Sequence, residues 1–526
     1  MAKKKIVKYY KDMYLGNLTE EQADTLIAIS NSKCIDSLKN CIYHLSNEVI
    51  TRVIAYATNY EAQPVLDTED IDIGEARDYQ TVGIAFMYTA LSAMLGDSVG
   101  LGKTIQIAGT VNLCTIEKEK TGKEPFRFLF LTDKNSIGQI SDKLIRHTAQ
   151  YVHAMSGEQK YVEPFIESME NNGVWCSVVG SHSLITNTKF FKWLNLNIDK
   201  FDMLIVDESF VLKNSSTDMF KNIQIIRPYF KRFIELNATP YETKIDDFYN
   251  QLRLVDDTML PTRVEFDKEY CKKDYRGYIP RVVGYKNEDL FRQRISLRYL
   301  ARTRKELGAK FENNNAVLMI SSLSSEQKDL MKKTSLWRMV CECPTALDSD
   351  IVFDYESVPK LMDLMTILAN KVAEEDTVML YCYYKEAQRE LKGFLEAEGY
   401  ECEIINGETT TKAKENIIHD FNNKLFKILI TNIQRSIDLT SCNNLILYSY
   451  DYNPQKLVQV EGRVTREFDI INKNIYLLCS KGRELKYLQT VIQKRANESS
   501  KIANRDLSCV LDILASSILN KEHSKK

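Results

Sequence analysis

The chain has 526 residues, room for roughly two to four domains with sizeable hydrophobic cores. Its formal net charge of −2 gives no overall attraction to nucleic acid, so any such site requires local clustering of Lys and Arg. The twelve scattered cysteines form no C-x-x-C pair, which predicts reduced thiols in the cytoplasm and no zinc site. The longest apolar stretch, 81–95, is too short to span a bilayer, and the lysines at the start of the chain precede no apolar run. We therefore expect neither a secretory signal nor a membrane role.

Residues 1–72 are predicted to be mostly helical. Thr19 is a plausible N-cap with Gln22 three residues later, and apolar residues recur at helical spacing further on. The segment carries no recognisable chemistry. We expect it to dock against the core, with binding of a partner protein as the alternative.

Residues 96–104 have the composition of a phosphate-binding loop. They follow the apolar stretch 81–95, which we predict to be a buried helix. Gly100 and Gly102 would let the backbone curl so that successive N–H groups point at one phosphate. Lys103 would reach the β- and γ-phosphates and Thr104 would offer its hydroxyl to Mg²⁺, at the start of a helix whose dipole favours anions. A glycine-rich turn between a strand and a helix is the alternative.

Short apolar runs that alternate with helical stretches follow this loop. The predicted strands are 126–133, 174–181, 203–208 and 232–239, and later 377–384, 401–406, 427–431, 445–450 and 474–479. Such near-continuous apolar runs indicate parallel sheets that are covered on both faces. The predicted fold class is therefore α/β with two units in tandem, of which only the first has a phosphate loop.

Composition predicts five regions along the chain. They are a helical N-terminal segment (1–72), the first α/β unit (73–255), a charged and mainly helical linker (256–360), the second α/β unit (361–485) and a helical, Lys-rich tail (486–526). Within the linker, 290–307 and 325–340 are predicted helices. A specific protein partner would be recognised through residues 1–72, the linker or the C-terminal tail.

An acidic pair ends one of the predicted strands. Asp207 and Glu208 follow an apolar run, at the edge where ligands collect in open α/β sheets. One carboxylate can hold Mg²⁺ through water while the next polarises an attacking water. A solvated acidic turn is the alternative for the pair alone, and the upstream phosphate loop favours the catalytic interpretation.

Two further stretches fit the same chemistry. Asn237-Ala-Thr-Pro240 would place Thr239 beside the γ-phosphate, and Gln459-Val-Glu-Gly-Arg-Val-Thr-Arg466 places Arg463 and Arg466 on one side of a helical turn. Two guanidiniums presented together suit a polyphosphate whose transition-state charge needs neutralising. We expect Arg466 to be the arginine finger, and a surface basic patch is the alternative for either arginine alone.

The ordered set of motifs resembles the superfamily 2 helicase-like ATPases, and in detail the Snf-type branch of double-stranded DNA translocases. Asp97-Ser-Val-Gly-Leu-Gly-Lys-Thr104 resembles the branch's D-E-x-G-L-G-K-T, in which an acidic residue takes the place of the first loop glycine. Asp207-Glu-Ser-Phe-Val-Leu-Lys-Asn214 resembles D-E-A-H-x-L-K-N. Arg77-Asp-Tyr-Gln80 resembles the adenine-reading motif, with Gln80 as the base contact, and Tyr299-Leu-Ala-Arg-Thr-Arg-Lys305 resembles the arginine-rich segment between the lobes.

The resemblance implies two RecA-like lobes with ATP and Mg²⁺ between them. Lys103, Thr104, Asp207 and Glu208 would form one wall, while Arg463 and Arg466 approach from the other. By the same resemblance, the remaining site residues are Gln459 for catalysis and Arg77, Gln80, Asp97, Gly100, Gly102, Thr239 and Gly462 for nucleotide binding, with Thr104 and Asp207 on the metal. A surface that binds nucleic acid without sequence preference (the track) would involve Thr132, Ser181, His182, Lys213, Tyr383 and Thr431. The alternative for each is an ordinary polar residue at the end of a strand.

Two departures from the branch bear on coupling between hydrolysis and movement. Phe210 stands where the branch has His, and residues 431–439 lack the glycines of its G-L-G-x-N-L segment. The leading hypothesis is a DNA-stimulated ATPase that translocates on duplex DNA. The alternatives are a viral-type NTPase that acts on RNA or transcription complexes, and a nucleic-acid clamp switched by ATP with weak turnover.

Overall fold

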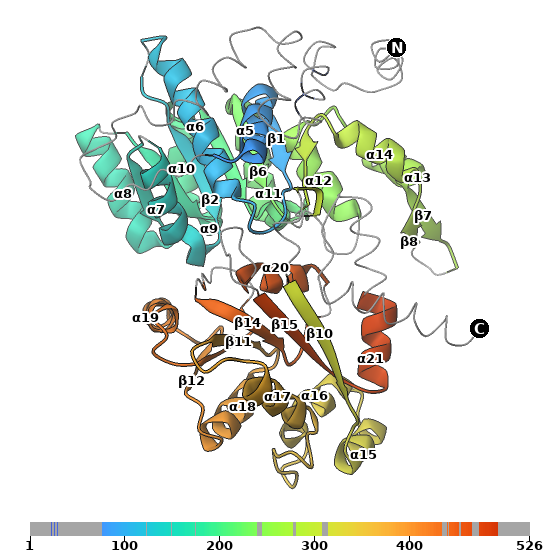
Figure 1. The fold of residues 1–526 in the computed structure, drawn as a ribbon. Coiled ribbons are helices and arrows are strands. Elements are labelled where there is room, and N and C mark those ends of the chain that lie inside the picture. Colours follow the sequence, from blue (N-terminus) through green and yellow to red (C-terminus); the bar gives the residue numbers. More distant parts are fainter. Residues whose placement is uncertain are drawn as a thin grey trace. The chain divides into compact units, whose positions relative to one another are not determined.

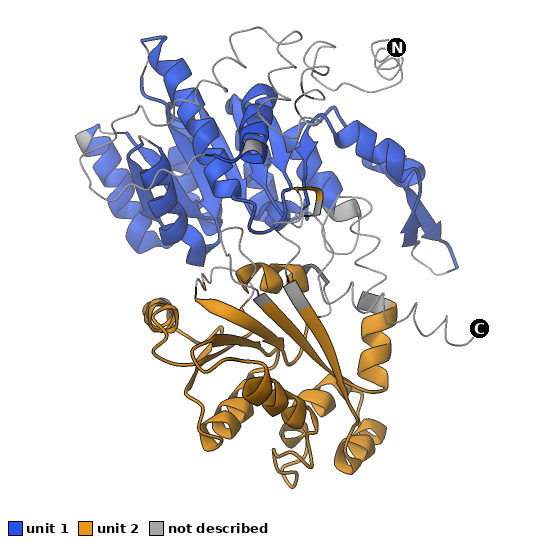
Figure 2. Ribbon diagram, in the orientation of Figure 1, with its two compact units in different colours: residues 1–303, 501–505 blue, residues 304–500, 506–526 orange. Residues whose placement is uncertain are grey.

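The computed structural model divides the chain into two compact units (Figure 2). Unit 1 comprises residues 1–303 and 501–505, and unit 2 comprises residues 304–500 and 506–526. The described residues are 23, 26, 29, 76–122, 124–148, 150–173, 175–238, 245–276, 280–303, 305–307, 314–433, 439, 441–451, 454–464 and 473–492.

Unit 1 is built on a seven-stranded parallel sheet with the strand order β3-β4-β2-β5-β6-β1-β9 (Figure 1). The strands are β1 (Ser92–Leu95), β2 (Phe128–Thr132), β3 (Val152–Met155), β4 (Ser177–Ser181), β5 (Met203–Asp207), β6 (Arg232–Leu236) and β9 (Tyr299–Leu300). All four strands predicted before residue 240 are present, which confirms the α/β fold with a parallel sheet.

Helices cover both faces of this sheet because its strands are apolar on both sides. On one face Phe128, Phe130 and Ile205 pack against helices α5 to α7, and on the other Leu129, Leu204 and Val206 pack against helices α8 to α12. The helices are α5 (Asp78–Ala90), α6 (Lys103–Glu119), α7 (Ile137–His147), α8 (Gln159–Asn172), α9 (Ser183–Thr186), α10 (Thr188–Leu196), α11 (Asp218–Ile226) and α12 (Ile245–Val255).

The apolar stretch before the phosphate loop is a helix followed by a strand, and the prediction of a continuous helix over 81–95 is wrong. Helix α5 ends at Ala90, Leu91 takes a positive φ of 60°, and β1 then runs into the loop. A short apolar run that is buried on all sides has no periodicity that separates strand from helix. The strand therefore leaves no signal of its own in this stretch.

The predicted helical linker, 256–360, is in fact divided between the two units. Its first part contains α13 (Arg263–Tyr270), an antiparallel hairpin of β7 (Cys271–Asp274) and β8 (Arg281–Tyr285), and α14 (Glu288–Ile295). The predicted helix 290–307 is interrupted, because β9 joins the sheet of unit 1 beside β1. Further on, β10 (Asn314–Ser321) joins the sheet of unit 2, and α15 (Ser325–Lys333) and α16 (Trp337–Glu342) replace one predicted helix.

Unit 2 contains a six-stranded parallel sheet with the order β10-β15-β14-β11-β13-β12. Its other strands are β11 (Thr377–Tyr381), β12 (Cys402–Ile405), β13 (Ile428–Thr431), β14 (Cys442–Leu447) and β15 (Lys473–Ser480). Two apolar cores lie on its faces, one with α17 (Lys360–Asn370) and α18 (Lys385–Ala397), the other with α19 (Thr411–Asn422) and α20 (Pro454–Val464). All five strands predicted for the second unit are present.

Three residues of the N-terminal segment are described. Ala23, Leu26 and Ile29 are fully buried in the core that α5, α6 and α7 form on the sheet of unit 1. These contacts agree with the expected docking of the segment. The predicted tail from residue 493 onward lies outside the described residues. Among the described helices, none has the length and apolar composition that crossing a bilayer requires.

Candidate active site

The register of the unit 1 sheet places the predicted residues in one row. Asp207 pairs with Leu236, Leu236 pairs with Leu95, and Leu95 pairs with Leu300. Since neighbouring strands are about 4.8 Å apart, the end of β5 lies roughly 10 Å from the start of the phosphate loop. Ser181 and Thr132 pair with each other on the other side of Asp207 and extend the row. The carboxyl edge of this sheet therefore gathers polar groups that are far apart in sequence.

The loop from β1 to α6 has the backbone of a phosphate-binding turn. Gly100 and Gly102 have φ values of +89° and +71°, which residues with a Cβ rarely adopt. A Cβ on Gly102 would also lie 2.3 Å from Gln80 Nε2. Helix α6 begins at Lys103, so the free N–H groups of its first turn belong to this loop. Gly100, Gly102, Lys103 and Thr104 thus lie together as the sequence predicts.

Lys103 links the loop to the acidic pair. Its Nζ donates to the Asp97 carbonyl O at 2.8 Å, and its positive charge opposes the rise that burial causes in the pKa of Asp207. The ammonium group therefore acts on both the glycine loop and the carboxylate that ends β5. A phosphate bound at this edge would find one cation and the amides of the loop.

Asp207 and Glu208 are held in a strained and partly desolvated turn. Burial and the neighbouring Glu208 raise the pKa of Asp207 to about 6, although Thr132 and Lys103 oppose this shift. Thr132 Oγ1 donates to Asp207 Oδ2 at 3.0 Å, and His182 Nε2 lies 2.8 Å from the Asp207 carbonyl O. Glu208 has a φ of +50°, a costly conformation for a residue with a side chain, and such outliers are frequent at active sites.

The donor chemistry of this edge fits Mg²⁺. Thr104 supplies a hydroxyl and Asp207 a carboxylate, and magnesium prefers such oxygen ligands together with phosphate oxygens and water. Within the described ranges, no group of three or more His, Cys, Asp or Glu side chains could hold a metal ion. With Thr104 and Asp207 as its protein ligands, Mg²⁺ would take its other ligands from phosphate oxygens and water.

Arg77 caps the start of α5, and Gln80 in the first turn of that helix touches the phosphate loop. The Arg77 N–H donates to Gln80 Oε1 at 3.0 Å, and Gln80 Nε2 donates to the Leu101 carbonyl O at 3.3 Å. Gln80 is only 3% exposed, so its amide fixes the loop from the side of α5. Its contact with adenine stays a prediction.

Three of the residues predicted for the second wall, Gln459, Gly462 and Arg463, belong to α20 of unit 2. Gln459 and Gly462 are buried and Arg463 is half-buried in the last turn of the helix. Arg466, the predicted arginine finger, lies outside the described residues, as does Thr239 in unit 1.

The predicted nucleic-acid contacts fall into two groups. The first group, Thr132, Ser181 and Thr431, is buried, and its hydroxyls form hydrogen bonds inside the protein. The Thr132 hydroxyl donates to Asp207, and the Ser181 hydroxyl accepts from the Gly157 N–H and bonds to the Ser183 hydroxyl. The Thr431 hydroxyl accepts from the Ile433 N–H. The second group, His182, Lys213 and Tyr383, is half-buried. Tyr383 and Thr431 lie at the carboxyl edge of the unit 2 sheet, where Thr431 pairs with Tyr381. Their roles stay predictions.

Phe210, which replaces the expected His, packs against Lys213. Lys213 Nζ stands 3.8 Å from the centre of the Phe210 ring, close enough for a cation–π interaction. The Lys213 carbonyl O also accepts a hydrogen bond from Asn250 Nδ2 at 2.6 Å. Phe210 therefore orients a lysine beside the acidic pair, although it cannot donate a hydrogen bond as His would.

Sequence reasoning missed two residues that support the loop. Arg302, just after β9, and Gln106, on α6, both contact the Asp97 carboxylate, which is fully buried. The only signal for Arg302 was its position in the arginine-rich string 299–305 directly after an apolar pair.

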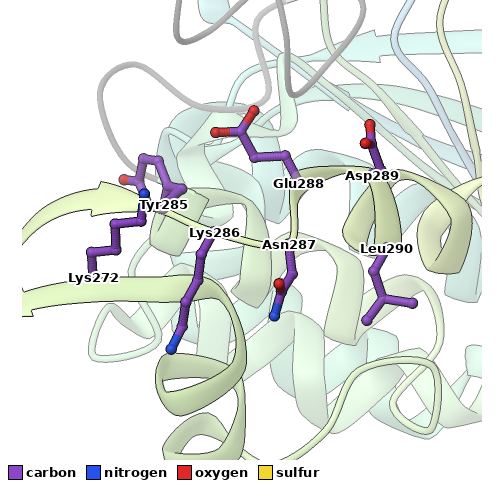
Figure 3. Close-up of a pocket in the computed structure, with 7 residues that line it drawn as sticks. All are labelled: Lys272, Tyr285, Lys286, Asn287, Glu288, Asp289 and Leu290. Atoms are coloured by element: carbon purple, nitrogen blue, oxygen red, sulfur yellow. The ribbon is translucent and has the colours of Figure 1, made fainter.

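A separate cavity of about 680 Å³ lies between the hairpin and α14 (Figure 3). It is lined by Lys272, Tyr285, Lys286, Asn287, Glu288, Asp289 and Leu290, with none of the phosphate-loop residues among them. Its lysines and carboxylates balance in charge, so it indicates no particular ligand.

Two protein-family models match the chain. The SNF2-related domain matches residues 79–382, and the helicase conserved C-terminal domain matches residues 358–467. The chain is 22% identical to the uncharacterized ATP-dependent helicase YqhH of Bacillus subtilis (strain 168) over 431 residues, 74% of this chain and 72% of that protein.

Other relatives are longer than this chain. The DNA repair and recombination protein RAD54-like of Drosophila virilis is 22% identical over 507 residues, 82% of this chain and 63% of that protein. The chromodomain-helicase-DNA-binding protein 3 homolog of Caenorhabditis elegans is 22% identical over 498 residues, 83% of this chain and 27% of that protein. The chain thus spans less than two thirds of either relative.

Among solved structures, the Sulfolobus solfataricus SWI2/SNF2 ATPase core in complex with dsDNA matches 86% of this chain and 97% of that chain, with 18% identity and a TM-score of 0.37. The SNF2-related match alone spans more than half of the sequence and contains both the phosphate loop and the acidic pair. The chain therefore belongs to the SNF2-related family of superfamily 2 helicase-like ATPases.

Proposed function

We propose that the protein is an ATPase stimulated by duplex DNA, which translocates on DNA without sequence specificity. Remodelling DNA, migrating branches or displacing bound proteins are the tasks that fit such a motor. The observation that carries the proposal is the SNF2-related match over residues 79–382, together with relatives named for DNA repair and recombination. The protein would then act wherever the genome lies.

In this proposal the residues of unit 1 bind and orient the nucleotide. Lys103 and the N–H groups of the loop neutralise phosphate charge, and Gln80 and Arg77 bind the base. Mg²⁺, held by Thr104 and Asp207 with the phosphates, supplies charge neutralisation when bound. Glu208 orients the attacking water. Arg463, Arg466 and Gln459 of unit 2 supply the remaining polar contacts to the polyphosphate.

For the track, we propose half-buried residues at the carboxyl edges of the two sheets. Lys213 has a cation–π contact that fixes its direction, and His182 and Tyr383 follow strand ends. Contacts of this kind address phosphates and carry little sequence information. The buried hydroxyls of Thr132, Ser181 and Thr431 would need a local rearrangement to take part.

A second candidate is a nucleic-acid clamp that ATP binding switches, with weak turnover. Phe210 favours it, because a phenyl ring cannot donate the hydrogen bond that the branch's His offers. The viral-type alternative, an NTPase that acts on RNA or transcription complexes, differs from the leading proposal in its stimulating nucleic acid.

ATP hydrolysis by the purified protein separates these candidates. It is measured without nucleic acid and with duplex DNA, single-stranded DNA or RNA, with Lys103→Ala and Arg466→Ala as control variants. We expect strong stimulation by duplex DNA that both substitutions abolish. Stimulation by RNA alone would favour the viral-type alternative, and tight ATP binding with negligible turnover on every nucleic acid would leave the clamp.

A further inference from the structure

One side chain, Arg302, connects three parts of the candidate ATP site. Its Nε donates to Asp97 Oδ1 at 3.0 Å, its Nη2 donates to Gln106 Oε1 at 2.8 Å, and its Nη1 donates to the Tyr79 carbonyl O. Asp97 belongs to the phosphate loop, Gln106 to α6, and Tyr79 to the first turn of α5 beside Gln80. Arg302 therefore fixes the loop, the helix that follows it and the adenine motif with one guanidinium.

The charge of Asp97 makes this connection necessary. The carboxylate is 0% exposed, and a buried charge is strongly unfavourable unless it is paired and hydrogen-bonded. It accepts hydrogen bonds from the Arg302 N–H at 3.1 Å, from Arg302 Nε and from Gln106 Nε2 at 2.9 Å. Without the guanidinium, Lys103 is a cation within reach, since its Nζ already contacts the Asp97 carbonyl O. Arg302 thus pairs with the Asp97 carboxylate, so that Lys103 stays available to bind the phosphates.

The packing of α5 shows how closely this network is built. A Cβ on Gly83 would lie 1.8 Å from Gln106 Oε1 and 2.8 Å from Arg302 Nη2. Only glycine lets α5 approach the network at this distance. The position of α5, and with it that of Gln80, therefore depends on the same hydrogen bonds as the loop.

Unit 1 contains a matched arginine at the opposite end of β1. Arg298 donates through Nε and Nη2 to Asp256 Oδ2 at 3.0 and 2.9 Å, and its Nη1 donates to the Ala90 carbonyl O at 2.8 Å. Both side chains of this pair are almost fully buried, as are those of Arg302 and Asp97. Arg298 has the same chemistry as Arg302 and no hydrogen bond to the phosphate loop, so it serves as a control for the stability of the fold.

We propose that Arg302 is a positioning residue for ATP. Through Asp97 it holds the phosphate loop, and through Tyr79 it holds the adenine motif. Because the first segment of unit 1 ends at Thr303, the residue that fixes the loop is also next to the point where the chain first passes to unit 2. A displacement of that connection would then reach the loop through the Arg302 side chain and through the backbone bond that the Ser98 N–H donates to the Arg302 carbonyl O at 3.1 Å. This inference rests on the proposed ATP site.

The test compares Arg302→Gln with Arg298→Gln in the full chain. Binding of a fluorescent ATP analogue, the KM and kcat of ATP hydrolysis, and the Tm are measured for both. We expect Arg302→Gln to raise the Kd for the nucleotide by about tenfold or more, because a tenfold change in Kd is about the free energy of one lost hydrogen bond to a charged group. We expect Arg298→Gln to change the Kd by less than about twofold, although it should lower the Tm by about as much as Arg302→Gln does. Arg302→Lys, which keeps the charge and loses the fork, should give an intermediate Kd.

A double variant tests the role assigned to the Asp97 charge. Asp97→Asn combined with Arg302→Gln removes both charges, so the Kd should return part of the way toward that of the wild type. Equal weakening of ATP binding by Arg298→Gln and Arg302→Gln would show only a general loss of structure and overturn the proposal. An unchanged Kd in Arg302→Gln, with binding lost in Lys103→Ala, would overturn it and leave the ATP site standing. Unchanged binding in Lys103→Ala would remove the ATP site itself.

Discussion

Both units bury ion pairs at the carboxyl ends of their strands, but the pair in unit 1 contacts a loop and the pair in unit 2 joins helices to the sheet. In unit 1 the Arg302–Asp97 pair lies under a glycine loop with positive φ values. In unit 2, Lys360 Nζ lies 2.9 Å from Glu484 Oε1 and donates to the Tyr448 carbonyl O, just after β14, and both charged side chains are 1% exposed. Here the ion pair fastens α17 to α21 (Arg483–Tyr487) and to the sheet.

The difference shows that a buried ion pair is not by itself a sign of a ligand site. The Lys360–Glu484 pair is closed off by packed helices, and near it Arg338 lies 3.6 Å from Glu342 in α16. What distinguishes unit 1 is the backbone: glycines at φ values that other residues avoid, followed directly by a helix N-terminus. The first two of the four predictions below test whether Lys103 of unit 1 acts in catalysis and Lys360 of unit 2 in folding, and the other two test further features of each unit.

The largest expected effect is on catalysis in unit 1. Lys103→Ala should lower the rate of ATP hydrolysis about a hundredfold or more, because it removes a cation aimed at developing phosphate charge. Its Tm should change little, since the Lys103 side chain is only half-buried. Steady-state kinetics and thermal unfolding check both statements. A variant with normal turnover would contradict the assigned role.

Lys360→Met should instead destabilise unit 2. Removing one partner leaves the Glu484 carboxylate buried without its cation, which costs about 3–5 kcal/mol. Hydrogen exchange in α17 and β15 should rise, whereas nucleotide binding by unit 1 should persist. The control is Lys360→Met combined with Glu484→Leu, which should recover much of the lost stability. If the double variant is no more stable than the single one, packing rather than charge explains the loss.

Glu342 should make the stability of unit 2 depend on pH. Burial raises its pKa from 4.5 to about 7, and Glu484 adds to this shift, although Arg338 and Lys360 oppose it. Between these two values the folded state binds more protons than the unfolded state, so the contribution of Glu342 to stability falls as the pH rises from 4.5 to about 7. Glu342→Gln should flatten that decline. Urea unfolding between pH 4.5 and 8 measures it, and an unchanged slope would contradict the assignment.

The smallest effect concerns Phe210. Phe210→Leu removes a cation–π contact worth about 0.5–2 kcal/mol and frees the direction of Lys213. We expect the basal ATPase to change little and the stimulation by duplex DNA to fall about twofold to thirtyfold, which corresponds to that free energy. Lys213→Ala provides the matched control and should give a similar loss. Unaltered stimulation in both variants would separate Lys213 from the track.

The parts of the site that could be predicted from sequence are local in the chain. Gly100, Gly102, Lys103 and Thr104 lie within one short turn, and Asp207 and Glu208 end one strand, so residue type and order were sufficient to find them. The fold class followed from apolar runs that alternate with helices. These predictions needed no knowledge of which strands are neighbours.

The contacts that sequence could not show depend on topology. Arg302 and Asp97 are 205 positions apart and meet only because β9 pairs with β1. A strand of two residues has no periodicity, and it lies inside a segment whose charge favoured helix. The division of 256–360 between two sheets was missed for the same reason, since β10 finds its partner in β15, more than a hundred residues later.

The late position of β9 also has a consequence for biosynthesis. A ribosome makes the phosphate loop early, but the arginine that holds it emerges 205 positions after Asp97. Until then the Asp97 carboxylate has no Arg302 to pair with, and the edge of β1 that later pairs with β9 is open. Newly made unit 1 therefore gains its ATP-binding loop among the last of its parts, once nearly all of its own sheet has left the ribosome.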